Sequence, residues 1–189
     1  MTIDISKITQ FLKETYDVDV VIKDTAEDGI TIAELKQKQI VVNKDSRDDL
    51  GILFVIAHLF GHMVQFTNYE KYRHLVETVE KPKPLKLSDE FKEEFYQYEL
   101  EGYKIGKGLI EAVYGNDFAE EINEKYHIYL ETDFVLFWQY LTTGNQLSNA
   151  EFNKRLEENF ESMHGLIKNP LPAIELPKTI SPSHGANVY

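Results

Sequence analysis

Two histidines stand four residues apart in an apolar segment of this sequence, Ala57-His58-Leu59-Phe60-Gly61-His62. Residues at positions i and i+4 of an α-helix project from the same face, about one turn apart. Two imidazoles placed in this way can bind one tetrahedral metal ion, most familiarly zinc. The same spacing also occurs where histidines only form hydrogen bonds with their neighbours. The pattern therefore indicates either a metal centre or a structural pair of histidines.

The surroundings of the two histidines favour the metal centre. The segment is otherwise apolar, and buried polar rings need partners, which one metal ion would supply to both rings. Phe54, His58, Gly61, His62 and Gln65 share one stripe of the helix. Gly61 has no side chain and permits a close approach by another helix. We therefore expect a second helix to pack on this stripe and to supply a third ligand.

The segment 89–113 predicts that second helix, and it carries two candidate carboxylates. Glu99 lies at one edge of its apolar stripe, beside Gly102 and Gly106, whereas Glu101 lies at the opposite edge. Glycines inside a helix cost stability relative to alanine, so they indicate close packing on the Glu99 side. We prefer Glu99 to Glu101 as the third ligand, and both carboxylates remain candidates at this point.

Three segments follow one another in an order known from a family of zinc enzymes. Gln39–Asn43 is an expected strand that ends in Asn, Ala57–His62 carries the histidines, and Glu99–Gly106 reads Glu-Leu-Glu-Gly-Tyr-Lys-Ile-Gly. This order resembles the ImmA/IrrE family of gluzincin-like zinc metallopeptidases. There a strand ending in Asn precedes A-H-E-L-G-H, and an E-x-x-A-(N/D)-x-F-A pattern carries the third ligand. The resemblance covers residues 1 to 115 and implies that His58, His62 and Glu99 bind zinc.

The chain departs from the family pattern at Leu59, where the family has the glutamate of H-E-x-x-H. That glutamate is the general base that acts on the metal-bound water. Leucine cannot accept a proton, and the loss of a general base costs orders of magnitude in rate. Tyr103 and Gly106 are further departures. We therefore assign no catalytic residue and regard Leu59 as a degenerate general-base position.

These residues predict a zinc-binding, metallopeptidase-like protein that is catalytically impaired or inactive and binds a protein or peptide partner. The family resemblance implies a transcriptional regulator as that partner. Two other functions fit the same residues. One is an active zinc metallopeptidase with an unconventional base, and the other is a metal-free protein-interaction module with structural histidines.

The rest of the sequence predicts an α+β fold, with a small N-terminal sheet packed on a helical body around the central HxxxH helix. Apolar residues at helical spacing indicate helices, and short β-branched segments indicate strands. Residues 68–87 predict a loop with a short helix around 72–79. The expected helices cover 5–16, 48–66, 89–113, 118–142 and 148–163, and the expected strands cover 18–22, 30–35 and 39–43.

The chain length of 189 residues suits one domain. We expect a single metallopeptidase-like domain over residues 1–165. From residue 166 to 189 the sequence has several prolines and no helical period, which predicts an extended C-terminal tail that wraps the body or stays disordered.

Charge and composition exclude several classes of function. The formal net charge of −12 repels nucleic-acid phosphates and anionic lipids, so we expect no nucleic-acid partner. The longest apolar stretch, residues 52–60, is too short to span a bilayer. The absence of cysteine excludes disulfides and thiolate ligands. Because residues 1–20 lack the pattern of a signal peptide, we expect a cytoplasmic protein without membrane contact.

Overall fold

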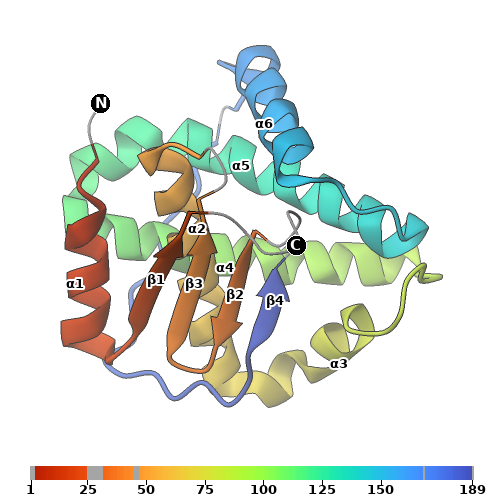
Figure 1. Ribbon diagram of the computed structural model, residues 1–189, viewed down its shortest axis with the longest axis horizontal. Coiled ribbons are helices and arrows are strands. Elements are labelled where there is room, and N and C mark those ends of the chain that lie inside the picture. Colours follow the sequence, from red (N-terminus) through yellow and green to blue (C-terminus); the bar gives the residue numbers. More distant parts are fainter. Residues whose placement is uncertain (1–2, 25–31, 45–46, 168, 189) are drawn as a thin grey trace.

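The computed structural model describes residues 3–24, 32–44, 47–167 and 169–188 and has the expected α+β fold (Figure 1). The predicted strand 30–35 begins outside the described residues. The short helix expected at 72–79 is longer and starts at Tyr69. The helices are α1 (Ile5–Tyr16), α2 (Asp49–Gln65), α3 (Tyr69–Val79), α4 (Asp89–Tyr114), α5 (Asn116–Thr143) and α6 (Asn149–Met163), with a short 3-10 helix η1 (Phe66–Asn68), and the strands are β1 (Asp19–Lys23), β2 (Ala33–Lys36), β3 (Gln39–Asn43) and β4 (Ala186–Val188).

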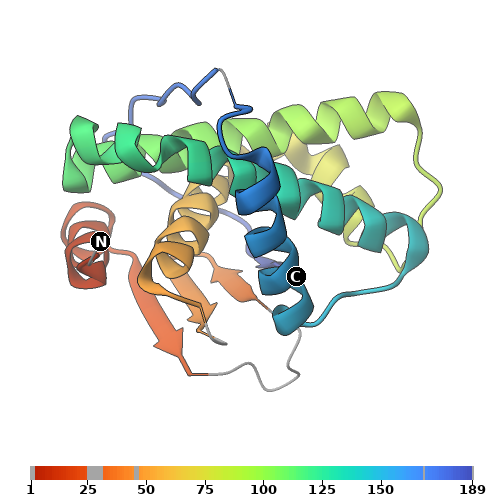
Figure 2. The ribbon, with the colours of Figure 1, turned by 90° about the horizontal axis from the view of Figure 1, so that it is seen from above.

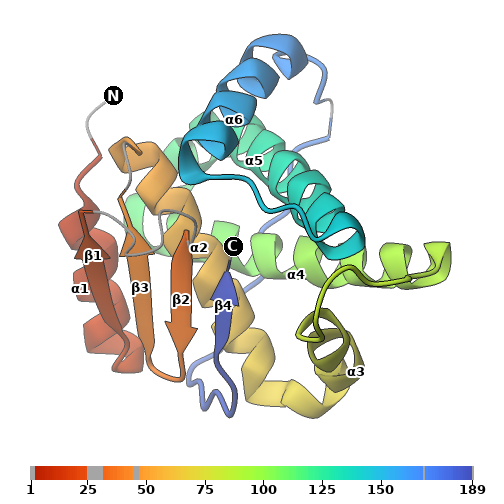
Figure 3. The ribbon, with the colours of Figure 1, turned by 45° about the vertical axis from the view of Figure 1, so that its right-hand side comes forward.

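The sheet has the strand order β1-β3-β2-β4, which can be followed from left to right in Figure 3. β1 pairs with β3 in parallel, with Val20 opposite Ile40, and β2 pairs with β3 antiparallel. Ile40 and Val42 are completely buried in the core, whereas most of β1 is exposed. The sheet therefore covers the helical body with the side chains of its central strand.

The central helix α2 lies between the sheet and the pair of helices α4 and α5, as Figure 2 shows from above. Asp48 caps its first turn by accepting a hydrogen bond from the backbone N–H of Gly51 at 2.8 Å. Almost every residue from Ile52 onward is buried, because other elements pack on all sides of the helix. The helical run Asp49–Val79 is apolar enough to cross a membrane, but 83% of that apolar window is buried within the fold.

Two glycines allow α2 and α4 to cross at very short range. A Cβ atom on Gly61 would lie 2.6 Å from the carbonyl carbon of Gly102 and 2.9 Å from its Cα. One turn further along α4, a Cβ atom on Gly106 would lie 2.6 Å from the carbonyl oxygen of Ala57. Real side chains do not fit at such distances, so the expected close packing on the Gly61 and Gly106 faces is present in the structure.

Between α6 and β4, residues 164–167 and 169–185 follow the body without helix or strand. The Tyr16 hydroxyl donates to the carbonyl oxygen of Pro177 at 2.8 Å, and the Lys107 ammonium donates to that of Leu171 at 2.6 Å. The backbone N–H of Ser183 donates to the carbonyl oxygen of Phe66 at 3.2 Å. β4 then pairs antiparallel with β2. The sequence analysis did not predict this fourth strand.

The glycine crossing makes a testable prediction about stability. We expect Gly61→Ala to lower the free energy of unfolding by at least about 2 kcal/mol, because the new methyl group must push two buried helices apart. Urea denaturation measures the difference. Gly51→Ala is the matched control on the same helix, because its added Cβ would meet only ordinary contacts at 3.4 Å. Equal stability of the two variants would contradict the close crossing.

Candidate metal centre

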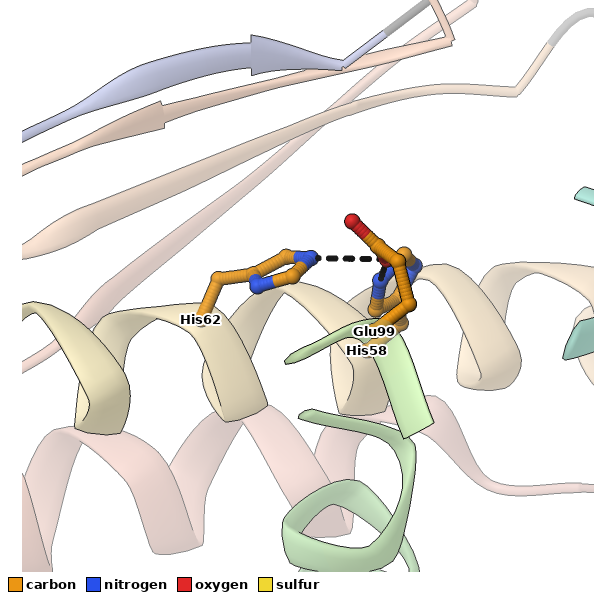
Figure 4. A group of neighbouring side chains, drawn as sticks. All are labelled: His58, His62 and Glu99. Carbon is orange, nitrogen blue, oxygen red and sulfur yellow. Dashed lines mark hydrogen bonds and ion pairs between the residues drawn. The ribbon is translucent and has the colours of Figure 1, made fainter. Parts of the chain in front are cut away.

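α2 and α4 bring the three predicted residues together, as Figure 4 shows. The Nε2 atom of His58 lies 3.0 Å from Oε2 of Glu99, and Nε2 of His62 lies 3.3 Å from the same oxygen. One ligand atom from each residue lies within 4.8 Å of the others. The exposed fractions of His58, His62 and Glu99 are only 3%, 6% and 8%. This buried cluster could hold a metal ion.

The separations of Glu99 from the two imidazole nitrogens suit a small divalent ion. In a tetrahedral site with bonds of 2.0–2.1 Å, neighbouring ligand atoms stand about 3.3 Å apart, close to the distances from both rings to Glu99. Two histidines and one glutamate also form a ligand set used by catalytic zinc sites. The donor set alone does not select one metal, because imidazole and carboxylate bind several divalent ions of the first transition row.

The outer nitrogen of His62 is held by Gln65, one turn along the same helix. Nδ1 of His62 lies 2.8 Å from Oε1 of Gln65, and Nε2 of Gln65 donates to the carbonyl oxygen of Tyr98 at 2.8 Å. The second bond fixes the amide so that its oxygen faces the ring. In the neutral ring, Nδ1 then carries the proton and the lone pair of Nε2 points towards Glu99. This is the tautomer that a metal ligand needs.

The outer nitrogen of His58 faces a buried carboxylate that the sequence analysis missed. Nδ1 of His58 lies 3.6 Å from Oδ2 of Asp133, on α5, and the Tyr103 hydroxyl donates to the same oxygen at 3.0 Å. The Tyr103 ring stacks on His58 with 4.1 Å between ring centres. The separation between Asp133 and His58 is too long for a hydrogen bond, whereas Gln65 is hydrogen-bonded to His62. The only sequence signal of Asp133 is an acidic residue next to the apolar residues Phe134 and Val135.

Glu101, the alternative ligand, and Leu59, the degenerate general-base position, are not part of the cluster. The Glu101 carboxylate is hydrogen-bonded by the Tyr72 hydroxyl at 2.6 Å and by the Lys71 ammonium at 3.4 Å, and its side chain is 35% exposed. Glu99 is the carboxylate that faces both histidines. Leu59 is completely buried in the hydrophobic core. The position next to His58 therefore contributes no proton acceptor.

Burial and mutual charge determine the protonation of the cluster. Burial and the charge on His62 lower the pKa of His58 to about 4. Burial also favours the neutral form of His62, but the Glu99 carboxylate outweighs it and raises the pKa of His62. The two histidines overcome the burial of Glu99 and lower its pKa to about 2. Burial and the charge of Glu99 raise the pKa of Asp133 to about 7. At neutral pH, Glu99 is thus a carboxylate whose charge a proton on His62 or a metal cation can balance.

Comparison with known proteins adds no relative: neither a protein-family model, nor a curated protein, nor a solved structure matches this chain. The site is therefore interpreted from its own geometry.

The low pKa of His58 predicts how stability depends on pH in protein treated with a chelator. Between pH 4 and 6.5 the unfolded chain binds a proton at His58 that the folded chain does not, so stability rises with pH through this window. We expect His58→Gln to have a shallower rise, measured by urea denaturation at a series of pH values. Identical slopes in the two proteins would show that His58 is not held neutral.

Proposed function

We propose that this chain is a zinc-binding, metallopeptidase-like protein that binds a protein or peptide partner without cleaving it efficiently. The observation that carries the zinc assignment is the convergence of Nε2 of His58, Nε2 of His62 and the Glu99 carboxylate in one buried cluster. Gln65 supports it by fixing the outer nitrogen of His62, and both rings present Nε2 to Glu99. The partner class rests on the ImmA/IrrE resemblance of residues 1 to 115.

His58, His62 and Glu99 would hold the zinc, which when bound supplies a Lewis acid that polarises carbonyl groups and water. The residues around it support impaired catalysis. Leu59 replaces the general base with a buried apolar group. Asp133 lies 3.6 Å from Nδ1 of His58, whereas Glu99 lies at Nε2, so the Asp133 carboxylate is behind the ring and not beside the ligand atoms. The Tyr103 hydroxyl also donates a hydrogen bond to Oδ2 of Asp133.

A metal-free interaction module is the second candidate, and the charge balance of the cluster favours it. The raised pKa of His62 and the lowered pKa of Glu99 describe a buried ion pair that is complete without a metal. Gln65 accepts a hydrogen bond from the outer nitrogen of His62 in this form as well. The zinc-binding protein and the metal-free module differ in whether a divalent ion displaces the proton on His62. Metal titration of the purified protein measures this difference.

Zinc binding predicts a ligand-dependent increase in thermal stability. Zinc at one hundred times its dissociation constant adds about 2.7 kcal/mol to the folded state, which raises the melting temperature by roughly 5–10 °C in a chain of this size. We expect this shift in the wild type and its loss in His58→Ala and His62→Ala. Differential scanning fluorimetry, with chelated protein titrated with zinc, measures it.

His74→Ala is the matched control, because this histidine pairs with Glu94 on the surface and lies outside the cluster. His74→Ala should show the full increase in melting temperature when zinc is added. An unchanged melting temperature in the wild type, together with no metal in the purified protein, would favour the metal-free module instead.

The loss of the general base predicts weak peptidase activity. We expect the zinc-loaded wild type to cleave a peptide library at least a hundredfold more slowly than Leu59→Glu, because the substitution restores a proton acceptor next to the first ligand. Mass spectrometry of the products gives the rates. Leu59→Gln is the matched control, since it has nearly the same shape but cannot act as a base. Efficient cleavage by the wild type that a chelator abolishes would contradict the proposal and require another base.

A further inference from the structure

The outer edge of β1 carries backbone groups that pair with no strand in the part of the chain that the structure describes. The N–H of Asp19 and the carbonyl oxygen of Lys23 both form hydrogen bonds with the chain on the β3 side, at 2.9 Å and 2.8 Å. Because the backbone groups of successive residues point to opposite sides of a strand, those of Val20 and Ile22 face the outer edge. This edge, on the left of the sheet in Figure 3, is therefore a template on which another strand can pair.

Two apolar side chains of β1 are also exposed, Val21 by 38% and Ile22 by 41%. Ile22 lies opposite Val42 of β3, which is completely buried, so the exposure of Ile22 comes from its position at the end of the sheet. The other large apolar side chains that are exposed among the described residues, Val135 and Leu166, lie far apart in the sequence. β1 is thus the place where exposed apolar side chains adjoin open backbone groups.

The sequence of β1, Asp19-Val20-Val21-Ile22-Lys23, is complementary to itself when two copies run antiparallel. With Val21 of one copy opposite Val21 of the other, each Val20 lies opposite an Ile22, and the outward backbone groups exchange four hydrogen bonds. Each Asp19 then lies opposite a Lys23, and opposite charges across an antiparallel pair are stabilising. We propose that two copies of this chain associate through their β1 edges and join their sheets about a two-fold axis.

The charged ends of β1 are available for this pairing. Asp19 contacts the ammonium of Lys13 in its own chain at 3.0 Å, but its side chain remains 57% exposed, and a carboxylate can accept hydrogen bonds from two cations. Lys23 is exposed as well. The edge is short and buries less than the roughly 1,000 Å² of a stable interface, and the net charge of −12 on each copy opposes association. We therefore expect a weak and reversible dimer.

Analytical ultracentrifugation of the full chain, with a chelator present and at physiological ionic strength, tests the association. We expect a dissociation constant on the order of 100 μM, and a protein that stays monomeric up to about 1 mM would overturn the proposal. Val21→Lys places two like charges face to face and should weaken the dimer at least about tenfold. Val135→Lys is the matched control, because it adds the same charge at an exposed valine on α5 and should leave the dimer unchanged. Equal dissociation constants of the two variants would overturn the β1 edge as the interface.

A pair of charge reversals tests the register. Asp19→Lys and Lys23→Asp each change an exposed side chain and place like charges opposite each other, so each variant alone should dimerise at least about tenfold more weakly than the wild type. In an equimolar mixture every changed side chain faces an opposite charge, and we expect mixed dimers with nearly the affinity of the wild type. Both variants must fold for this recovery to occur. A mixture no better than its components, or a dimer that neither reversal weakens, would overturn the proposed pairing.

Discussion

The distance between α2 and α4 is the constraint on which the rest of the structure depends. Gly61 and Gly106 lack the side chains that would collide with the backbone of the facing helix, so backbone packs against backbone. One of these helices carries His58 and His62 and the other carries Glu99, so the same contact sets the spacing of the metal-ligand candidates. Interior glycines destabilise a helix by roughly 0.5–1 kcal/mol each relative to alanine. The buried contact between the two helices offsets that cost.

The cluster is built around a single negative charge in an apolar interior. Gln65 is hydrogen-bonded to the outer nitrogen of His62, Asp133 lies 3.6 Å from that of His58, and Glu99 faces both inner nitrogens. A buried carboxylate requires a cation, and a proton on His62 serves as well as a metal ion in electrostatic terms. A metal ion that bound at this site would displace that proton, so its apparent affinity would increase with pH.

Local patterns predicted the parts of the structure that depend on short sequence spacing. Helical and strand periodicity predicted the bounds of β3 and α2 to within one residue at each end. The i, i+4 spacing of the histidines and the glycines beside Glu99 predicted that His58, His62 and Glu99 form one site. The contact of Asp133 with His58 could not be predicted from the sequence, because only the packing of α5 on α4 brings this carboxylate to the ring. The burial of the Arg47 side chain and its unpaired donors could not be predicted either, because they are properties of the folded chain. β4 has only three residues, and its partner strand is distant in sequence, so no local pattern announces it.

That distant pairing also gives the fold a second way to assemble. Leu35 pairs with Ala186, and the segment before β4 contains Pro177 and Pro182, which keep it extended. In a domain-swapped dimer, β4 of each copy would lie on β2 of the other, with the same hydrogen bonds as in one chain. Such an exchange creates no new contact at the strand edge and needs only that two unfolded tails meet. If such an exchange took place, a higher protein concentration during folding would favour the interleaved dimer over the monomer.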